Sequence, residues 1–292
     1  MLKIATEVID WNHLTDYEAD VIIVGSQQFG LYAPTNLSQE AIKEAISLIN
    51  KSDKAIALRV DRIMQEDDLE ELRIFLQDVV TKEVDYVIFS DMAVYSLLQK
   101  QGFSRQFIFN AKTLNCSLND AKYYQSLGID VLLSHELPCD DIVEITKAKN
   151  VCLEGYSHSL IFYSYRQLIS SYYEKYSLDT MKEVKNLTIR EQNTKGLYNV
   201  IENEHGTFIY QHQRYAIFYE LPLLQDVKLL MIQPHFMEEQ ELRKSIRLYR
   251  TAILHGPTHE GYEALLKCYP LTDSGFLYRK PMILEEGQDE KN

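Results

Sequence analysis

The sequence lacks the patterns that identify most metalloenzymes, secreted proteins and membrane proteins. Its four cysteines, Cys116, Cys139, Cys152 and Cys268, form no CxxC pair, so we interpret them as reduced thiols of a cytoplasmic protein. There is no HExxH zinc motif, and Gly256-Pro257 interrupts the helix that would align His255 with His259. No signal-peptide pattern opens the chain, and its apolar runs fall well short of the roughly 20 residues of a membrane span. We therefore expect neither a metal site nor membrane attachment.

Nucleophile and nucleotide motifs are missing as well. No GxSxG elbow, GxGxxG loop or Cys–His pairing is evident. The net charge of −13 makes the chain a poor match for a phosphate backbone, which argues against a DNA partner. Contact with RNA would need a local basic patch or a second protein. Two stretches are locally basic, residues 182–195 and the run from Arg243 to Arg250, although a helix with charges on its outer face explains the second equally well.

What the sequence does contain is a regular alternation of apolar strands and amphipathic helices. A β-branched run, Val21–Val24, ends at Gly25, and the pattern then continues for some way without a break. Continuous apolar strands separated by helices are typical of a parallel sheet covered on both faces. The short, even period predicts an α/β fold, a TIM-like (β/α) barrel. The expected strands are 21–25, 55–60, 86–89, 106–109, 131–133, 151–154 and 229–232, and the expected helices are 38–49, 68–80, 91–100, 117–127, 140–149 and 239–254.

The pattern changes in the later part of the chain. Two apolar runs, 198–201 and 207–210, flank the turn-like segment Glu202–Gly206, which predicts a β-hairpin excursion from the barrel near residues 190–220. We expect residues 1–284 to form one barrel-like domain that includes this hairpin. Residues 285–292 are strongly charged and are expected to be a disordered acidic tail.

Residues at the carboxyl ends of barrel strands are the candidates for chemistry, because those ends share one face of the barrel. Asp61, Asp91, His135 and Glu136 would make an acid/base set there, with Lys112 close by. The alternative is that these side chains cap helices and hydrate loops. The strand-end residues as a group are Gln27, Gln28, Arg59, Asp61, Ser90, Asp91, Asn110, Lys112, His135, Glu136, Glu154, Tyr156, Gln233 and His235.

The most unusual stretch is Glu154–Ser171, which is rich in tyrosine and serine. The chain has 20 tyrosines, and many of them gather in and just after this segment. A β-rich, partly exposed surface would explain them. Tyrosine also suits interfaces, because it buries a large area at low entropic cost and keeps a polar tip. We therefore favour an interface over a cofactor pocket for this face.

Several short motifs, taken in order, resemble the collagenase-like (U32-type) peptidase family, and the match covers nearly the whole chain. Each motif is weak alone, whereas their order and spacing are specific. Better understood relatives in this family resemble tRNA uridine hydroxylation proteins, and this chain is similar to the short members found in Gram-positive bacteria. The motifs are Ala19–Leu31, Asn36-Leu37-Ser38, Glu202–Ile209, Glu220-Leu221-Pro222, Leu248-Tyr249-Arg250 and Asp273-Ser274-Gly275-Phe276.

The family signature, a His-Gly followed by a cysteine and a serine-rich turn, departs from the family pattern here. The resemblance places Tyr156 and Ser157 at the His-Gly, and Leu160 at the cysteine, with His158 out of register. The candidate residues of the signature segment are Glu154, Tyr156, Ser157, His158, Ser164 and Arg166. Thiolates hold the iron–sulfur cluster that the resemblance implies for members with suitable cysteines. Since those cysteines are absent at the matching positions, we expect no cofactor.

The resemblance thus implies a degenerate member of the family. The first interpretation is a non-catalytic partner subunit in tRNA wobble-uridine hydroxylation, bound to a longer paralogue and contacting tRNA through that complex. The second is a free-standing peptidase, hydrolase or tRNA hydroxylase that uses strand-end acids and bases. The third is a barrel that binds a small molecule without catalysis.

Overall fold

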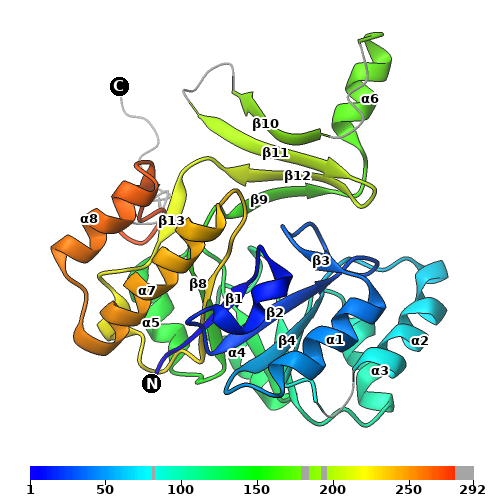
Figure 1. Ribbon diagram of the computed structural model, residues 1–292, viewed down its shortest axis with the longest axis horizontal. Coiled ribbons are helices and arrows are strands. Elements are labelled where there is room, and N and C mark those ends of the chain that lie inside the picture. The colour runs from blue at the N-terminus through cyan, green and yellow to red at the C-terminus, as the bar shows by residue number, and fades with distance from the viewer. Residues whose placement is uncertain (81–82, 179–183, 192–195, 280–292) are drawn as a thin grey trace, which may run out of the picture.

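The computed structural model describes residues 1–80, 83–178, 184–191 and 196–279. Eight parallel strands form a closed barrel in the order β14-β1-β2-β4-β5-β6-β7-β8, and β14 pairs with β8 to close it (Figure 1). The barrel prediction is therefore confirmed. The barrel strands are β1 (Lys3–Glu7), β2 (Val21–Ser26), β4 (Ala55–Val60), β5 (Tyr86–Phe89), β6 (Gln106–Phe109), β7 (Ile129–Leu132), β8 (Val151–Ser157) and β14 (Leu229–Ile232).

Helices and short 3-10 turns connect these strands on the outside of the barrel. The helices begin where the sequence indicates: Ser38 and Ser117 each accept a hydrogen bond from a backbone N–H in the first turn of the helix that follows. The outer elements are η1 (Trp11–Asp16), α1 (Gln39–Ile49), η2 (Glu66–Asp68), α2 (Leu69–Val79), α3 (Met92–Lys100), α4 (Leu118–Ser126), α5 (Cys139–Thr146), η3 (Leu221–Leu223), α7 (Glu239–His255) and α8 (His259–Cys268).

Two apolar layers stabilise the barrel. A small inner cluster fills its lumen, with Ala5, Ile23, Ile88, Cys152 and Met231 among its members. A larger cluster packs the outward faces of the strands against the helices. Alternate residues of each strand point to opposite faces, so a strand buried on both sides must be apolar throughout. This double burial explains why the strands appear as unbroken apolar runs in the sequence.

The predicted hairpin is part of a second, four-stranded antiparallel sheet in the order β10-β11-β12-β9. The hairpin itself is confirmed, since β11 (Leu197–Asn203) and β12 (Gly206–Gln211) pair across the expected turn. The predicted elements do not include the outer strands β9 (Leu160–Ser164) and β10 (Val184–Arg190), or helix α6 (Leu168–Lys175). This sheet stands over one end of the barrel, with α6 projecting from it (Figure 1). The short strands β3 (Asn36–Leu37), β13 (Arg214–Ala216) and β15 (Thr272–Asp273) extend the barrel sheet.

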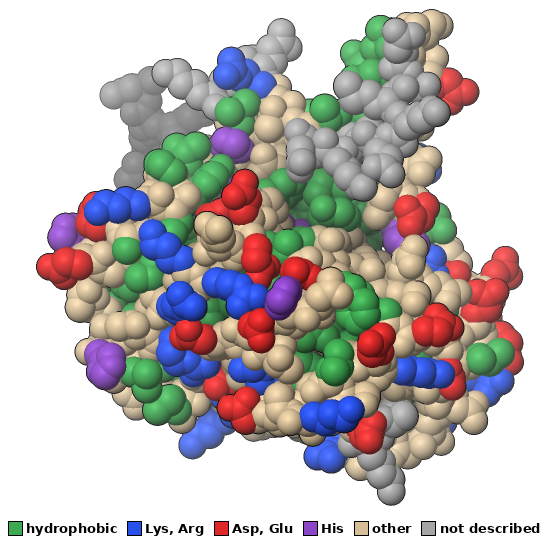
Figure 2. Space-filling model, viewed as in Figure 1, with side chains coloured by type: hydrophobic (Ala, Val, Ile, Leu, Met, Phe, Trp, Pro, Cys, Tyr) green, Lys and Arg blue, Asp and Glu red, His purple; other side chains and the backbone are tan. Residues whose placement is uncertain are grey.

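Of the two basic stretches of the sequence, the structure describes the one on α7 (Glu239–His255) in full and the other only in part. The cations of α7 form ion pairs: Arg247 Nε lies 2.6 Å from Glu18 Oε1, and Arg250 Nη2 lies 2.7 Å from Asp20 Oδ2. Figure 2 shows cations and acids intermingled on this face of the barrel. The charges of α7 therefore belong to a solvated outer face. Residues 182, 183 and 192–195 of the other stretch, and the expected acidic tail at 285–292, lie outside the described residues.

Within the part of the chain that the structure describes, no helix is both long enough and apolar enough to cross a membrane.

Candidate functional site at the barrel mouth

Charged and polar side chains from several strands and loops meet at the carboxyl ends of the barrel strands, the end covered by the second sheet. They include Glu7 at the end of β1, Arg59 in β4 and Glu154 in β8. The remaining residues come from the loops after the strands and from the sheet above. The cavity between them is lined by Glu7, Ile23, Leu31, Tyr32, Arg59, Asp61, Ile88, Asn110, Lys112, His135, Glu154, Leu160, Tyr210, Met231, Gln233 and His235.

A buried ion cluster occupies one side of this mouth. Arg59 Nε lies 3.2 Å from Glu7 Oε1, and Arg59 Nη1 lies 3.4 Å from Asp61 Oδ2. Lys112 Nζ donates to the same Asp61 oxygen at 3.1 Å. Arg59 has room to lie across the barrel because β2 has Gly25 beside it: a Cβ there would lie 2.8 Å from Arg59 Nη2. The glycine that ends the first strand of the family-like motif thus serves the site.

Asp61 is ionised at neutral pH even though its side chain is buried. Burial raises the pKa of a carboxyl group, but Arg59 and Lys112, together with the Leu31 N–H at 2.9 Å, outweigh burial and lower the pKa of Asp61 to about 2. Lys112 holds its place with a left-handed backbone, φ 58°, a conformation that costs a non-glycine residue energy and is concentrated at functional sites. The Asn110 carboxamide stabilises that turn by accepting the Lys112 N–H at 3.1 Å.

On the other side of the mouth, Glu154 is held only by neutral donors. Gln233 Nε2 donates to Glu154 Oε1 at 3.0 Å, and the Ser157 and Ser159 hydroxyls donate to Oε2 at 2.9 and 3.1 Å. The Ser157 hydroxyl is thus engaged in a hydrogen bond to the Glu154 carboxylate. These three donors are neutral, so they leave the formal negative charge of the carboxylate without a cationic partner.

Two buried histidines complete the cluster. His235 Nε2 donates to the Tyr32 carbonyl oxygen at 3.1 Å, which leaves Nδ1 as an acceptor. Burial lowers the pKa of His235, so the ring is neutral at pH 7. The His135 ring lies 6.3 Å from that of Tyr215, with its Nε2 buried.

The second sheet closes the mouth from above. Tyr210 of β12 and Leu160 of β9 line the cavity together with Leu31 and Tyr32 from the loop after β2. The remaining cavity volume is about 40 Å³, far below the roughly 300–1,000 Å³ typical of pockets for larger organic ligands. A nucleotide would not fit without displacement of the sheet.

The structure separates the four candidate catalytic residues into two pairs. Asp61 and His135 line the mouth. Asp91 instead caps α3, where its Oδ1 accepts the Ala93 N–H at 2.9 Å and its Oδ2 accepts the Met64 N–H at 2.9 Å. Glu136 is exposed, and it is not among the residues that line the cavity.

Sequence reasoning missed Glu7 and Tyr210 as members of the site. The start of the chain was not recognised as a strand, so its last residue was not counted among the strand ends. Tyr210 reaches the mouth from a hairpin that lies about 150 positions beyond Asp61 in the chain. Lys112, Arg59, Gln233 and His235 were on the list of strand-end residues, and the strand-end rule was the signal that found them.

In the signature segment, Tyr156 and His158 make hydrogen bonds and ring contacts inside the protein. Tyr156 is fully buried, its hydroxyl oxygen accepts a hydrogen bond from Arg214 Nη1 at 3.2 Å, and its ring lies 6.0 Å from that of Tyr249. His158 Nδ1 donates to the Gln211 carbonyl oxygen at 2.9 Å. Its ring lies between those of Phe236 and Tyr269, at 5.5 and 5.0 Å.

Farther along the segment, Ser164 and Arg166 shape a turn. The Ser164 hydroxyl oxygen accepts the Arg166 N–H at 3.1 Å, and the Arg166 carbonyl oxygen accepts the Thr207 hydroxyl at 2.8 Å. The Arg166 side chain is exposed. These two residues connect β9 to α6 and lie apart from the cavity lining.

The residues present do not fit an iron–sulfur cluster. All four cysteines are described and are free: Cys152 is buried in the barrel lumen, Cys116 is exposed, and Cys139 and Cys268 lie on α5 and α8. Burial raises the pKa of the Cys152 thiol, which disfavours the thiolate form that binds a cluster. Within the described ranges, no three His, Cys, Asp or Glu side chains are grouped so that they could hold a metal ion.

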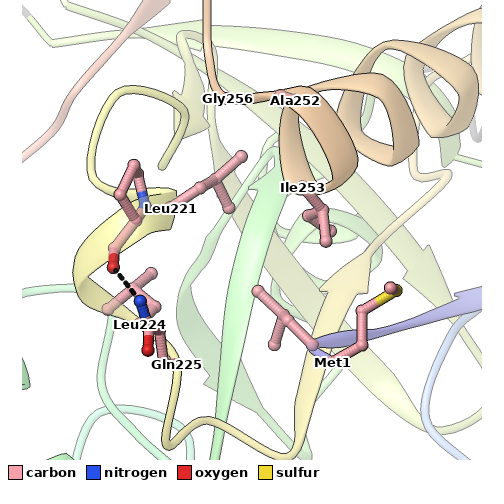
Figure 3. Close-up of a pocket in the computed structure, with 9 residues that line it drawn as sticks. Met1, Leu221, Leu224, Gln225, Ala252, Ile253 and Gly256 are labelled. Carbon is pink, nitrogen blue, oxygen red and sulfur yellow. Dashed lines mark hydrogen bonds between the residues drawn. The ribbon is translucent and has the colours of Figure 1, made fainter.

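A larger cavity of about 480 Å³ lies at the opposite end of the barrel (Figure 3). It is bounded by the start of the chain, by η3 and by the end of α7, with Met1, Leu221, Leu224 and Ile253 among its walls. None of its lining side chains is titratable. It therefore lacks the groups that acid/base chemistry needs, and the smaller mouth remains the candidate site.

Comparison with known proteins places the chain in a family. The family model described as Peptidase family U32 matches residues 8–284. The tRNA hydroxylation protein P2 of Bacillus subtilis is 25% identical over 274 residues, which cover 90% of this chain and 89% of that protein.

Two further similarities are partial. An uncharacterized protease, MJ0090, of Methanocaldococcus jannaschii is 29% identical over 165 residues, and the match spans 54% of this chain and 40% of that protein. Among solved structures, the U32 peptidase Mk0906 has 15% identity and a TM-score of 0.45, covering 55% of this chain and 70% of that one.

Proposed function

This chain belongs to peptidase family U32, and from that premise we propose that it acts as a non-catalytic partner subunit in tRNA wobble-uridine hydroxylation, in the cytoplasm. The similarity to the B. subtilis tRNA hydroxylation protein P2, along nine tenths of the chain, supports the process. The catalytic partner would be a longer paralogue of the same family, and tRNA would be contacted through the complex.

One observation carries the non-catalytic proposal: Tyr156, Ser157 and Leu160, at the positions of the family signature, offer no accessible reactive group, and the nearby His158 is buried. Tyr156 is buried against Arg214, and Ser157 donates its hydroxyl to Glu154. His158 is buried with its ring between two aromatic side chains. A nucleophile or cluster ligand needs an accessible thiolate, hydroxyl or imidazole beside an activating base. We propose that this chain binds no iron–sulfur cluster and serves as a scaffold.

The proposed interface is the projecting unit of α6 and its flanks. Every residue of α6 is at least partly exposed, and large apolar side chains lie open to solvent along it. Exposed aromatic groups clustered on one element are typical of interfaces between proteins. The exposed set is Phe162, Tyr165, Leu168, Tyr172 and Tyr176, with exposed fractions of 39–55%.

Deletion of the gene in its natural host tests the proposal. We expect wobble-uridine hydroxylation in total tRNA, measured by mass spectrometry of nucleosides, to fall, and the longer paralogue to co-purify with tagged protein. A His135→Gln copy should restore hydroxylation fully, because a scaffold needs no base at the barrel mouth. Normal hydroxylation in the deletion strain, with no paralogue recovered, would refute the role.

A free-standing enzyme is the second candidate, favoured by the meeting of Asp61, His135 and Lys112 at the barrel mouth. Under this alternative, purified protein alone changes unmodified tRNA or denatured collagen, and His135→Gln abolishes that change. The same variant thus separates the two functions, since it is silent under the first and inactivating under the second. Protein abundance measured by immunoblot controls for loss of folding.

A further inference from the structure

The cavity at the barrel mouth contains buried polar atoms whose hydrogen bonds are unfilled. Arg59 Nε makes no hydrogen bond but lies 3.2 Å from Glu7 Oε1 in an ion pair. Glu7 Oε2, His135 Nε2 and His235 Nδ1 have no hydrogen-bond partner among the described residues. The three residues are 7%, 6% and 4% exposed and all line the same cavity. A buried polar atom left without a partner costs roughly 1–3 kcal/mol. Three such atoms around one cavity indicate a ligand that would satisfy them.

The charge of the mouth indicates the sign of that ligand. Three carboxylates, Glu7, Asp61 and Glu154, face two cations, Arg59 and Lys112, so the side chains sum to −1. Glu154 has neutral donors only. The unfilled atoms include a carboxylate oxygen and the acceptor nitrogen of His235, whose Nε2 already donates to Tyr32. The ligand should therefore be a cation that donates hydrogen bonds.

The donor groups and the aromatic walls of the cavity narrow the chemical class of the ligand further. No three acidic, histidine or cysteine side chains in the described part of the chain are grouped so that they could hold one metal ion, which favours a hydrogen-bonding organic cation over a metal ion. Aromatic rings form one wall: Tyr210 and Tyr32 lie 5.0 and 5.9 Å from the His235 ring. A planar guanidinium carries N–H donors on three nitrogens and stacks on aromatic faces. The small cavity excludes a nucleotide and suits a group of only a few atoms.

We infer that the barrel mouth binds a small guanidinium group, either of a free compound or of an arginine side chain. Glu7 Oε2 and His235 Nδ1 accept its N–H donors, and the rings of Tyr210 and Tyr32 flank its plane. Because the site is internal to the barrel, the inference is independent of any role in tRNA hydroxylation. It is therefore tested on the purified full chain without RNA or partner.

The experiment titrates the protein with guanidinium chloride by calorimetry and follows the histidine ring signals by NMR. Urea, which has the same planar shape without charge, and ammonium chloride, which has charge without the plane, are the matched probes. We expect saturable binding of guanidinium alone, at a Kd on the order of millimolar, with shifts of the His135 and His235 signals. Agmatine and acetyl-arginine amide then distinguish a free ligand from a side chain, and binding of either one supports the site.

Variants locate the binding. Glu7→Gln removes the charge and should weaken binding by about tenfold or more, about 1.4 kcal/mol. His235→Gln provides the same test if Glu7→Gln fails to fold, since Arg59 loses an ion partner in that variant. Glu18→Gln, a change at a surface carboxylate paired with Arg247, should leave binding unchanged. Equal responses to urea and guanidinium, no saturable response, or undiminished binding in both mouth variants would overturn the inference.

Discussion

At the scale of single residues, polar groups of the signature segment make structural contacts. His158 is the clearest case, because its ring is buried, donates from Nδ1 to the Gln211 carbonyl oxygen, and leaves Nε2 without a partner. Burial, followed by the nearby charge of Arg214, lowers the pKa of His158 to about 3 from 6.5. A histidine that remains neutral to such low pH serves packing rather than proton transfer near pH 7.

That pKa leads to a prediction about acid stability. Between pH 6.5 and about 3 the unfolded chain binds a proton at His158 and the folded chain does not. The contribution of His158 to stability is thus fully present above pH 6.5 and is lost as the pH falls toward 3, by on the order of 4 kcal/mol. We expect His158→Gln, whose amide can still donate to Gln211, to flatten the unfolding free energy over this range in urea titrations. The same change at exposed His13 is the control, and an unaltered pH slope in His158→Gln would contradict the argument.

Part of the candidate site was predictable at this scale. Asp61 and His135 were found because carboxyl ends of parallel strands converge, a rule of geometry that holds without knowledge of any contact. Asp91 satisfied the same rule, yet its carboxylate is used by two backbone N–H groups. A position directly after a strand therefore predicts that a residue lies near the barrel mouth. Whether its side chain faces the cavity depends on the local backbone N–H groups that compete for it.

At the scale of elements, the seam between β8 and β14 decides whether the barrel closes. Gly155 of β8 lies against Leu230 of β14, and a Cβ at residue 155 would lie 2.5 Å from Leu230 Cγ. We expect Gly155→Ala to destabilise the fold by about 1–3 kcal/mol through overpacking. Equilibrium unfolding in urea measures this, and Leu230→Val in the same chain should recover part of the loss. Additive effects of the two changes would show that the contact is not the cause.

Helix α6 depends on one carboxylate. Glu202 accepts the Ile169 N–H at 2.7 Å, the Ser170 N–H at 2.9 Å and the Ser170 hydroxyl at 2.5 Å, although no residue of α6 is fully buried. An eight-residue helix without a buried face is marginal alone. We expect Glu202→Ala to raise hydrogen exchange throughout α6 and leave the barrel amides protected.

The matched control for this prediction is Glu204→Ala, which changes an exposed carboxylate in the adjacent turn. Exchange in α6 should remain slow in that variant. Equal protection of α6 in wild type and Glu202→Ala would show that other contacts hold the helix.

The elements also show where sequence patterns fail. The inner strands and their helices were predictable because burial on both faces demands unbroken apolar runs. β1 was missed because its five residues, Lys-Ile-Ala-Thr-Glu, begin and end with charge and place Thr6 and Glu7 in the barrel wall. α6 and β9 were missed because neither buries a regular face, so neither leaves a period in the sequence.

At the scale of the whole molecule, the second sheet has two roles that the sequence could not reveal. One face, with Phe208 and Tyr210, packs with Leu31 and Tyr32 over the barrel mouth and restricts the cavity. Helix α6 projects from this sheet away from the barrel (Figure 1), and its tyrosines are exposed to solvent. The same sheet thus narrows the barrel mouth and presents an exposed aromatic surface, which is the arrangement that the proposed partner-subunit role requires.

This arrangement predicts that assembly and stability can be separated. Tyr172 and Tyr176 are 54% and 55% exposed, with ring centroids 4.7 Å apart. Replacing both by serine removes apolar area from the projecting surface but leaves the barrel core intact. We expect the double variant to melt at the wild-type temperature and to recover at least tenfold less of the longer paralogue in affinity purification, a loss of about 1.4 kcal/mol or more.

Tyr123, 62% exposed on α4, supplies the matched control, because Tyr123→Ser removes a similar area from the barrel side. Full recovery of the paralogue by the double variant would move the interface away from α6, whereas equal losses from both surfaces would show that the capture depends on apolar area without a defined site.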